Sequence, residues 1–218
     1  KTKCMVEVNG VSLIERLLGQ LDNRNLSKIV IVVGYEGQKL IDFIETLSIK
    51  TPITFVNNPI YDKTNNIYSL ALAKDYLVEE DTLLFESDLI FEDRAIDAIV
   101  DDPRETLALV DKYESWMDGT VTVLNETNEI QGILGKADFD WENRSSYYKT
   151  VNIYKFSKEF SRDVYMPFLQ AYQSAYGKNE YYETVLKVIS FLDGSTLKDM
   201  YASSNREEFA RNILIRNI

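Results

Sequence analysis

Lys28-Ile29-Val30-Ile31-Val32-Val33-Gly34 is the stretch of sequence that decides the fold. It is a nearly continuous run of β-branched residues, which is typical of a strand buried on both faces of a parallel sheet. Further strand-like runs follow at residues 53–56 and 81–88, and apolar residues recur at helical spacing before and between the runs. Strands that alternate with helices need crossover connections, so this half of the chain predicts an α/β fold with a mostly parallel sheet.

The other elements are predicted from turn residues and from changes in hydrophobic period. Asn9-Gly10 predicts a two-residue turn, and Ser12 followed by Glu15 predicts a capped helix start. Beyond residue 100, short strands separated by turn residues predict a mixed or antiparallel continuation of the sheet, with Asn128 in one turn. We expect helices at 69–77, 95–100, 158–176 and 180–191, and strands at 106–110, 119–124, 130–135 and 148–156.

Composition excludes several classes of function. The 218 residues carry 24 Lys and Arg against 35 Asp and Glu, and this net charge of −11 argues against a nucleic-acid partner. No apolar run is long enough to span a membrane. The absence of histidine excludes histidine bases, Ser-His-Asp triads and His-ligated metals. A single cysteine, Cys4, excludes a disulfide framework and indicates a reducing, cytoplasmic setting.

Candidate site residues stand where ligands bind open parallel sheets, beyond the carboxyl ends of the strands. The strand at 83–85 delivers Glu86-Ser87-Asp88 to that edge. A carboxylate there suits Mg²⁺, which takes one or two protein carboxylates together with substrate phosphates, although Asp88 could equally cap the following turn. Asn65 and Asn66 precede a predicted helix, where they could bind a base edge or an anion, or simply form an N-cap.

Two more clusters carry charge beside aromatic side chains. Lys149 lies in an apolar and aromatic strand without an acidic neighbour in sequence, so its partner is either a ligand phosphate or a structural salt bridge. Trp116 and Asp118 place an aromatic face near a carboxylate, a pairing that can hold an ammonium group. Such a tryptophan is more often half-buried packing.

Five segments, in this order along the chain, resemble one family of enzymes. The chain resembles bacterial nucleotidyltransferases of the sugar-nucleotide pyrophosphorylase superfamily, and within it the cytidylyltransferases that activate phosphocholine or 2-aminoethylphosphonate with CTP. The resemblance implies a Rossmann-like, nucleotide-diphospho-sugar transferase-like α/β fold, with a mostly parallel mixed sheet flanked by helices. It also implies one nucleotidyltransferase domain over residues 1–218. The matching segments are residues 2–10, 31–35, 64–70, 86–91 and 148–154.

The resemblance assigns roles to individual residues. Lys3 resembles the lysine that closes the family's glycine-rich signature and neutralises nucleotide phosphates, and Asp88 resembles the aspartate that binds catalytic Mg²⁺. Lys149 resembles the basic residue that faces the acceptor phosphonate or phosphate. These three are the implied catalytic residues. The implied nucleotide-binding residues are Lys3, Asn65, Asn66, Ser69 and Asp88, and the implied acceptor-binding residues are Lys149, Asn152, Trp116 and Asp118.

The implied reaction is transfer of CMP from CTP to 2-aminoethylphosphonate with release of pyrophosphate. The acceptor oxygen is already an anion at neutral pH, so Mg²⁺ and lysines can neutralise and align the charges without a histidine base. A primary ammonium favours carboxylates such as Asp118, whereas a quaternary ammonium needs an aromatic cage. The alternatives are phosphocholine as the acceptor, a sugar-1-phosphate nucleotidyltransferase, and a non-catalytic nucleotide-binding domain.

Two features depart from the family pattern. The family's first strand and glycine-rich loop would precede Lys1, and because the chain opens without Met we expect it to lie within a longer protein. Near the C-terminus, the family's second metal carboxylate is replaced by a stretch in which Asp199 could substitute. Residues 209–214 resemble the opening of aminoethylphosphonate transaminases, which predicts a fused aminotransferase domain. The sequence gives no indication of the oligomeric state.

Overall fold

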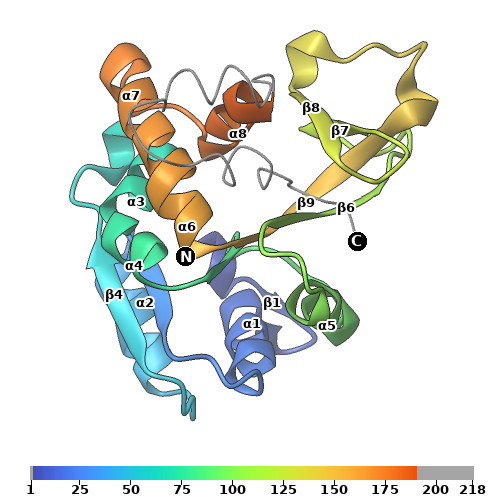
Figure 1. Ribbon diagram of the computed structural model, residues 1–218. Coiled ribbons are helices and arrows are strands. Elements are labelled where there is room, and N and C mark those ends of the chain that lie inside the picture. Colours follow the sequence, from blue (N-terminus) through green and yellow to red (C-terminus); the bar gives the residue numbers. More distant parts are fainter. Residues whose placement is uncertain (1, 191–218) are drawn as a thin grey trace.

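The structure is a computed structural model that describes residues 2–190 (Figure 1). Its first half alternates strands with helices, as predicted. The helices are α1 Leu13–Asp22, α2 Gly37–Glu45, α3 Asn66–Leu72, α4 Lys74–Glu79, α5 Asp93–Asp101, α6 Lys158–Phe160, α7 Met166–Tyr176 and α8 Tyr182–Ser190. The strands are β1 Glu7–Val8, β2 Val11–Ser12, β3 Ile29–Val33, β4 Ile53–Asn57, β5 Thr82–Phe85, β6 Leu107–Lys112, β7 Val121–Leu124, β8 Ile130–Leu134 and β9 Tyr147–Phe156.

The long strand β9 organises the second half of the molecule. It pairs antiparallel with β5, β6 and β7, and β8 pairs antiparallel with β7. Within residues 2–190, parallel pairing is confined to β3 and β4, whose register runs from Ile29 opposite Ile53 to Val33 opposite Asn57. The α/β class is therefore confirmed, but the parallel part is smaller than the sequence predicts, because β5 takes β9 as its partner.

β3 and β5 nevertheless lie in one layer of the fold. Val30 and Val32 of β3 and Leu84 of β5 pack against one apolar cluster. Ile31 of β3 and Phe85 of β5 pack against the other cluster, on the opposite face. In the described part of the chain, no strand pairs with the edge of β3 that faces away from β4. The strand that the resemblance places ahead of this sequence stays a prediction.

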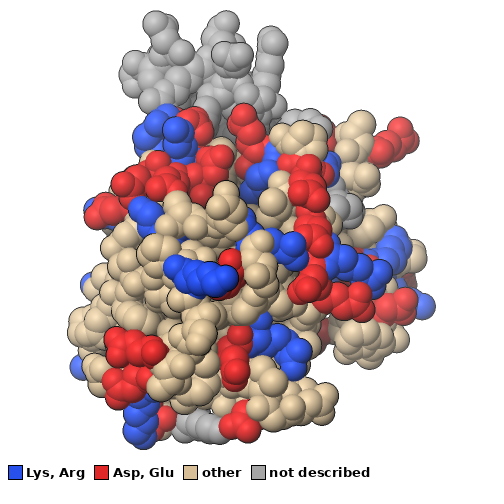
Figure 2. All heavy atoms as spheres, turned by 90° about the horizontal axis from the view of Figure 1, so that it is seen from below, with Lys and Arg blue, Asp and Glu red and all other residues tan. Residues whose placement is uncertain are grey.

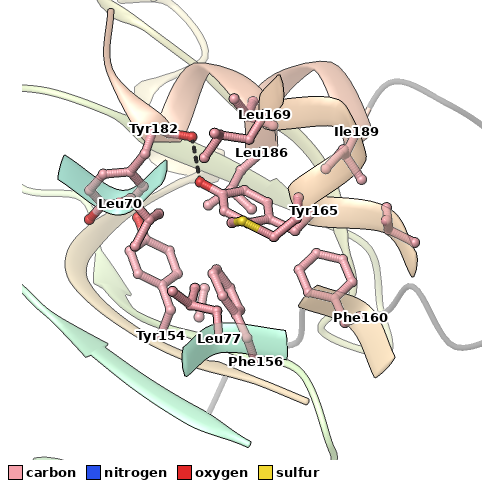
Figure 3. Close-up of a cluster of buried hydrophobic side chains, with 14 of the residues drawn as sticks. Leu70, Leu77, Tyr154, Phe156, Phe160, Tyr165, Leu169, Tyr182, Leu186 and Ile189 are labelled. Carbon is pink, nitrogen blue, oxygen red and sulfur yellow. Dashed lines mark hydrogen bonds between the residues drawn. The ribbon is translucent and has the colours of Figure 1, made fainter. Parts of the chain in front are cut away.

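Two apolar clusters cover the two faces of this layer. The larger cluster lies under α3, α4 and α6 to α8, and its fully buried aromatic residues include Tyr154 and Phe156 of β9 and Tyr165 (Figure 3). The second cluster joins α1 and α2 to the other face and includes Ile96 of α5. Burial of one large apolar side chain contributes about 1.5–3 kcal/mol, so these clusters hold β5 and β9 firmly in place.

Local signals in the sequence are largely confirmed. Asn9 and Gly10 form the turn between β1 and β2, with φ values of 55° and 78°. The Ser12 hydroxyl accepts a hydrogen bond from the Glu15 amide at 3.2 Å and so caps α1. Asn128 has a φ of 61° in the turn between β7 and β8. Each turn thus uses a residue type that tolerates positive φ.

Two predicted helices have a different internal structure. The helix expected at 69–77 is two helices, because the chain leaves helical geometry at Ala73, where α3 ends and α4 begins. The helix expected at 158–176 forms as predicted, but a π-helical segment at Ser161–Tyr165 joins α6 to α7. Such π segments occur frequently near functional sites, and this one places Tyr165 in the core beneath α8.

The surface agrees with the charge of the sequence. Acidic and basic side chains are interspersed on the face shown in Figure 2, which carries no continuous basic patch. Cys4 is buried, and it forms no disulfide. None of the helices in residues 2–190 combines the length and the apolar character that crossing a bilayer requires.

Candidate functional site

The candidate site lies where the carboxyl end of β5 meets β9 and the first turns of α3 and α8. Asn66, the first residue of α3, connects these elements with its side chain. Its Nδ2 donates to Oε1 of Glu86, which directly follows β5, at 3.4 Å. Its Oδ1 accepts from the backbone amide of Tyr182, the first residue of α8, at 2.9 Å. Asn66 of α3 therefore provides an acceptor for a backbone amide at the N-terminus of α8, which has no partner within its own helix.

Backbone hydrogen bonds hold the start of α8 against α3. The Asn65 amide donates to the Lys178 carbonyl at 3.0 Å, and the Ile67 amide donates to the Glu180 carbonyl at 3.3 Å. Inside the core, the Tyr165 hydroxyl donates to the Tyr182 carbonyl at 3.0 Å (Figure 3). These bonds fix the direction in which α8 enters the site.

Two carboxylates converge on Asn66 from β5 and α8. Burial raises the pKa of Glu86, and the negative charge of nearby Asp88 raises it further. Burial also raises the pKa of Glu183, with Glu86 as an additional cause. Among the described residues, the buried Oε2 atom of Glu183 has no hydrogen-bond partner. The Tyr182 hydroxyl lies near Glu86 and lowers its pKa, although this hydroxyl has no hydrogen-bond partner among the described residues.

Lys149 supplies positive charge on β9. Its Nζ donates to the Thr150 carbonyl at 2.5 Å. The same ammonium group lies next to Gly119, in the loop that precedes β7: a Cβ added to Gly119 would be 3.6 Å from Nζ. Burial lowers the pKa of Lys149, while the carboxylates of Glu183 and Asp118 partly offset this effect. In residues 2–190 no carboxylate lies within ion-pair distance of its ammonium group. The structural salt bridge that the sequence left open is therefore not formed there.

The structure brings several predicted residues together. Lys3 is exposed, and its positive charge lowers the pKa of Glu86. Asp88 is exposed two residues after Glu86. Asp118 lies close enough to Lys149 to affect its pKa, although its exposed carboxylate also pairs with Lys136 at 3.6 Å.

Other predicted residues are engaged elsewhere. Asn65 is the N-cap of α3, where its side chain accepts from the Asn66 amide at 2.9 Å. The Ser69 hydroxyl accepts from Nδ2 of the buried Asn58 at 3.3 Å. Trp116 is 79% exposed, so it is not the half-buried packing residue that the sequence also allowed. Oδ1 of Asn152 accepts a hydrogen bond from the Thr150 hydroxyl on the same strand, at 3.3 Å.

The sequence did not single out Glu86 or Glu183 as site residues. Glu86 had a signal, because it emerges from the same buried strand as Asp88. Glu183 had none, since an acidic residue in the first turn of a helix is explained by the helix dipole alone. Its place beside Glu86 depends on the contact between α8 and α3, which are more than a hundred residues apart in sequence.

Asp88 is the candidate ligand for Mg²⁺. Within residues 2–190, no three His, Cys, Asp or Glu side chains are placed to hold a metal ion together. The exposed carboxylate of Asp88 at the end of a strand suits Mg²⁺ when phosphate oxygens complete the shell. Asp88 therefore fits as a ligand of a metal ion shared with a nucleotide. Asp199, the candidate second carboxylate, and residues 209–214 lie outside the described residues.

Comparison with known proteins identifies relatives of this chain. The CMP-5'-(3-aminopropyl)phosphonate synthase of Streptomyces rubellomurinus is 23% identical over 188 residues, which cover 84% of this chain and 29% of that protein. The CTP:phosphoglutamine cytidylyltransferase of Campylobacter jejuni is 24% identical over 175 residues, which cover 74% of this chain and 67% of that protein. The chain thus spans less than a third of the first relative's length.

Solved structures share the fold. The CTP:phosphocholine cytidylyltransferase from Streptococcus pneumoniae has a TM-score of 0.64 at 18% identity, and the match covers 100% of this chain and 80% of that one. The predicted nucleotide-diphospho-sugar transferase-like fold is confirmed, and the relatives and structural neighbours are nucleotidyltransferases, as the resemblance implied. A family model described as "Domain of unknown function (DUF6564)" matches residues 2–129, more than half of the sequence. The chain belongs to this family.

Proposed function

We propose that this chain transfers CMP from CTP to 2-aminoethylphosphonate with release of pyrophosphate. The observation that carries the proposal is the setting of Lys149, a half-buried cation near the carboxylates of Glu183 and Asp118. Such a setting matches an acceptor that carries an anion and an ammonium group on one short molecule, because each charge of the acceptor then meets its opposite. The names of the relatives, which include a CMP-phosphonate synthase and two CTP-dependent cytidylyltransferases, support this reaction class.

Lys149 would bind the phosphonate. Burial disfavours its charged form, and an anion bound next to the ammonium group would favour that form again. The acceptor oxygen, held there, would attack the α-phosphorus of CTP while the bond to the leaving pyrophosphate breaks. Because this oxygen is ionised at neutral pH, the reaction needs alignment and charge neutralisation rather than a general base.

The nucleotide would lie at the end of β5. Asp88 would hold Mg²⁺, which supplies charge neutralisation for the phosphates when bound. Lys3 lies near the same strand end, where its charge already acts on Glu86, and it would neutralise a phosphate of CTP. The amides of Asn65 and Asn66, with the Ser69 hydroxyl, would lie along the nucleotide, with Asn66 also retaining its bonds to Glu86 and α8.

The choice of acceptor rests on the groups near Lys149. A primary ammonium donates hydrogen bonds and is served by carboxylates, whereas a quaternary ammonium needs aromatic faces. The carboxylates of Asp118 and Glu183 favour the primary ammonium of 2-aminoethylphosphonate. Trp116 is largely exposed, and it would contribute a single aromatic face at the rim. Phosphocholine is therefore the second candidate.

The experiment is pyrophosphate release by the full-length polypeptide that carries this chain. CTP and Mg²⁺ are supplied with either 2-aminoethylphosphonate or phosphocholine, in separate reactions. We expect release with the phosphonate, loss of at least about a hundredfold in Asp88→Ala, and unchanged release in the control Asp75→Ala, an exposed acidic residue of α4.

Each contrary result has a defined meaning. Release with phosphocholine alone would identify phosphocholine as the acceptor, and the proposed transfer of CMP from CTP would stand. CTP binding without release in either reaction would refute the proposed acceptors and favour a sugar-1-phosphate nucleotidyltransferase or a non-catalytic nucleotide-binding domain. Release that persists in Asp88→Ala would refute the assigned role of Asp88.

A further inference from the structure

The strand β9 changes its partner along one of its edges. β6 pairs with β9 from Tyr148 to Lys155. β5 pairs with the stretch 153–156, and β7 pairs with the stretch 147–149. Both stretches overlap the part that β6 occupies, so β5 and β7 must share the opposite edge of β9, one after the other. Thr150 still donates its amide to the Thr120 carbonyl at 3.3 Å, which leaves Val151 and Asn152 at the exchange.

The backbone of β9 is irregular at this exchange. Asn152 has a φ of 57°, in the left-handed region that strand residues other than glycine rarely adopt. On the opposite edge, Ala108 pairs with Tyr154 but Val110 pairs with Thr150, so three residues of β9 face one residue of β6. The strand therefore contains a bulge at residues 151–153. Bulges of this kind bend a strand and redirect its side chains.

The bulge is level with the candidate site. Ile153 pairs with Phe85, the last residue of β5, so Asn152 lies beside the point where Glu86 leaves the sheet. Lys149 lies on the other side of the bulge, where it pairs with Val121 of β7. Asn152 therefore lies on β9 between Lys149 and the residue that faces the end of β5.

We propose that Asn152 is a positioning residue that places Lys149 through its left-handed backbone rather than through its amide. The Asn152 side chain accepts its hydrogen bond, among the described residues, from the Thr150 hydroxyl on the same strand, at 3.3 Å. This role differs from the acceptor contact that the family resemblance implies for Asn152. In its link to turnover the inference rests on the proposed function, whereas the placement of Lys149 can be measured without turnover.

The test compares glycine with alanine. Asn152→Gly keeps access to positive φ and removes the amide, whereas Asn152→Ala removes the amide and disfavours positive φ. Asn128 is the matched control, because its φ of 61° lies in the exposed turn between β7 and β8. Asn128→Gly and Asn128→Ala therefore repeat the backbone change away from the site.

The first measurement is the rate of reductive methylation of Lys149 as a function of pH, followed by peptide mass spectrometry on the folded protein. The second measurement is kcat and KM with CTP and 2-aminoethylphosphonate. For Asn152→Gly, we expect the methylation rates of Lys149, kcat and KM to lie within about twofold of those of the natural protein. In Asn152→Ala, the Lys149 profile should shift and kcat should fall at least about tenfold, because a misplacement of ~1 Å can cost up to a hundredfold.

The outcomes separate this inference from the proposed function. Equal losses in Asn152→Gly and Asn152→Ala would overturn it, since the amide would then be the important group. A folded Asn152→Ala with an unchanged Lys149 profile would overturn it as well, as would the same Lys149 shift in Asn128→Ala. If Asn152→Ala does not fold, an unchanged profile in Asn152→Gly supports the backbone role. Without turnover in any protein, the proposed function fails, and the methylation profiles still decide the role of Asn152.

Discussion

Replacing Glu183 by glutamine should stabilise the protein at neutral pH. Burial raises the pKa of Glu183 above its ordinary value of 4.5, so at pH values between the ordinary and the raised pKa the folded chain keeps a proton that the unfolded chain has released. The free energy of unfolding of the natural protein must then fall as the pH rises from about 4.5 through the raised pKa. Glutamine has nearly the same shape as glutamate, but it carries no charge to bury.

The size of the effect follows from the shift in pKa. Each unit by which the folded value exceeds the unfolded value corresponds to about 1.4 kcal/mol. For a domain of this size, 1 kcal/mol changes the melting temperature by roughly 2–4 °C. Each unit should therefore appear as roughly 3–6 °C of added melting temperature in the variant at pH 8. Near pH 4 the difference should vanish, because the carboxyl is protonated in both states.

The assay is thermal unfolding at pH 4, 6 and 8, with urea unfolding at 25 °C to obtain free energies. Glu126→Gln, at an exposed position in the turn between β7 and β8, is the control that removes the same charge. The control should follow the pH dependence of the natural protein, whereas Glu183→Gln should flatten it. A Glu183→Gln variant that is less stable than the natural protein at pH 8, or that follows the same pH slope, would refute the reasoning.

Two further substitutions test the contacts that build the site. Asn66→Ala should lower the free energy of unfolding by about 1–2 kcal/mol, because the Tyr182 amide loses its acceptor at the start of α8; an unchanged urea midpoint would contradict this. Gly34→Ala should cost roughly 1–3 kcal/mol, because its Cβ would lie 2.6 Å from the Cβ of Tyr61; a melting temperature equal to that of Gly19→Ala or higher, at a helix position with open space, would contradict this.

Local patterns predicted the elements better than their partners. The β-branched run at 29–33 and the capped helix at Ser12 depend on neighbours in sequence, and both formed as predicted. The pairing of β5 with β9 joins residues about seventy positions apart, and no local pattern distinguishes it from pairing with β3. The break at Ala73 was also missed, because the apolar spacing continues through it and only the backbone angles change.

The sequence indicated candidate site residues where a charged side chain follows a buried strand or lies within one. Asp88 and Lys149 were singled out as candidates because a charge next to a buried strand is conspicuous in sequence. Glu183 was missed because its burial comes from packing α8 against α3, which Asn66 and the backbone bonds of residues 65–67 enforce. The left-handed conformation of Asn152 was missed too, since an asparagine inside a strand sequence gives no sign of a bulge.

The distribution of charge in the site also bears on how an acidic protein could bind a nucleotide. Exposed charges more than about 10 Å from a bound phosphate are largely screened at moderate salt, so the net charge of −11 does not by itself prevent nucleotide binding. Glu86 and Glu183 are different, because burial weakens the screening of their charges. They would repel a triphosphate placed beside them. Under the proposed function, the phosphates can therefore lie near Glu86 only where Lys3, and Mg²⁺ held by Asp88, would offset its charge, and the Glu183 side of Lys149 is left to the cationic end of the acceptor.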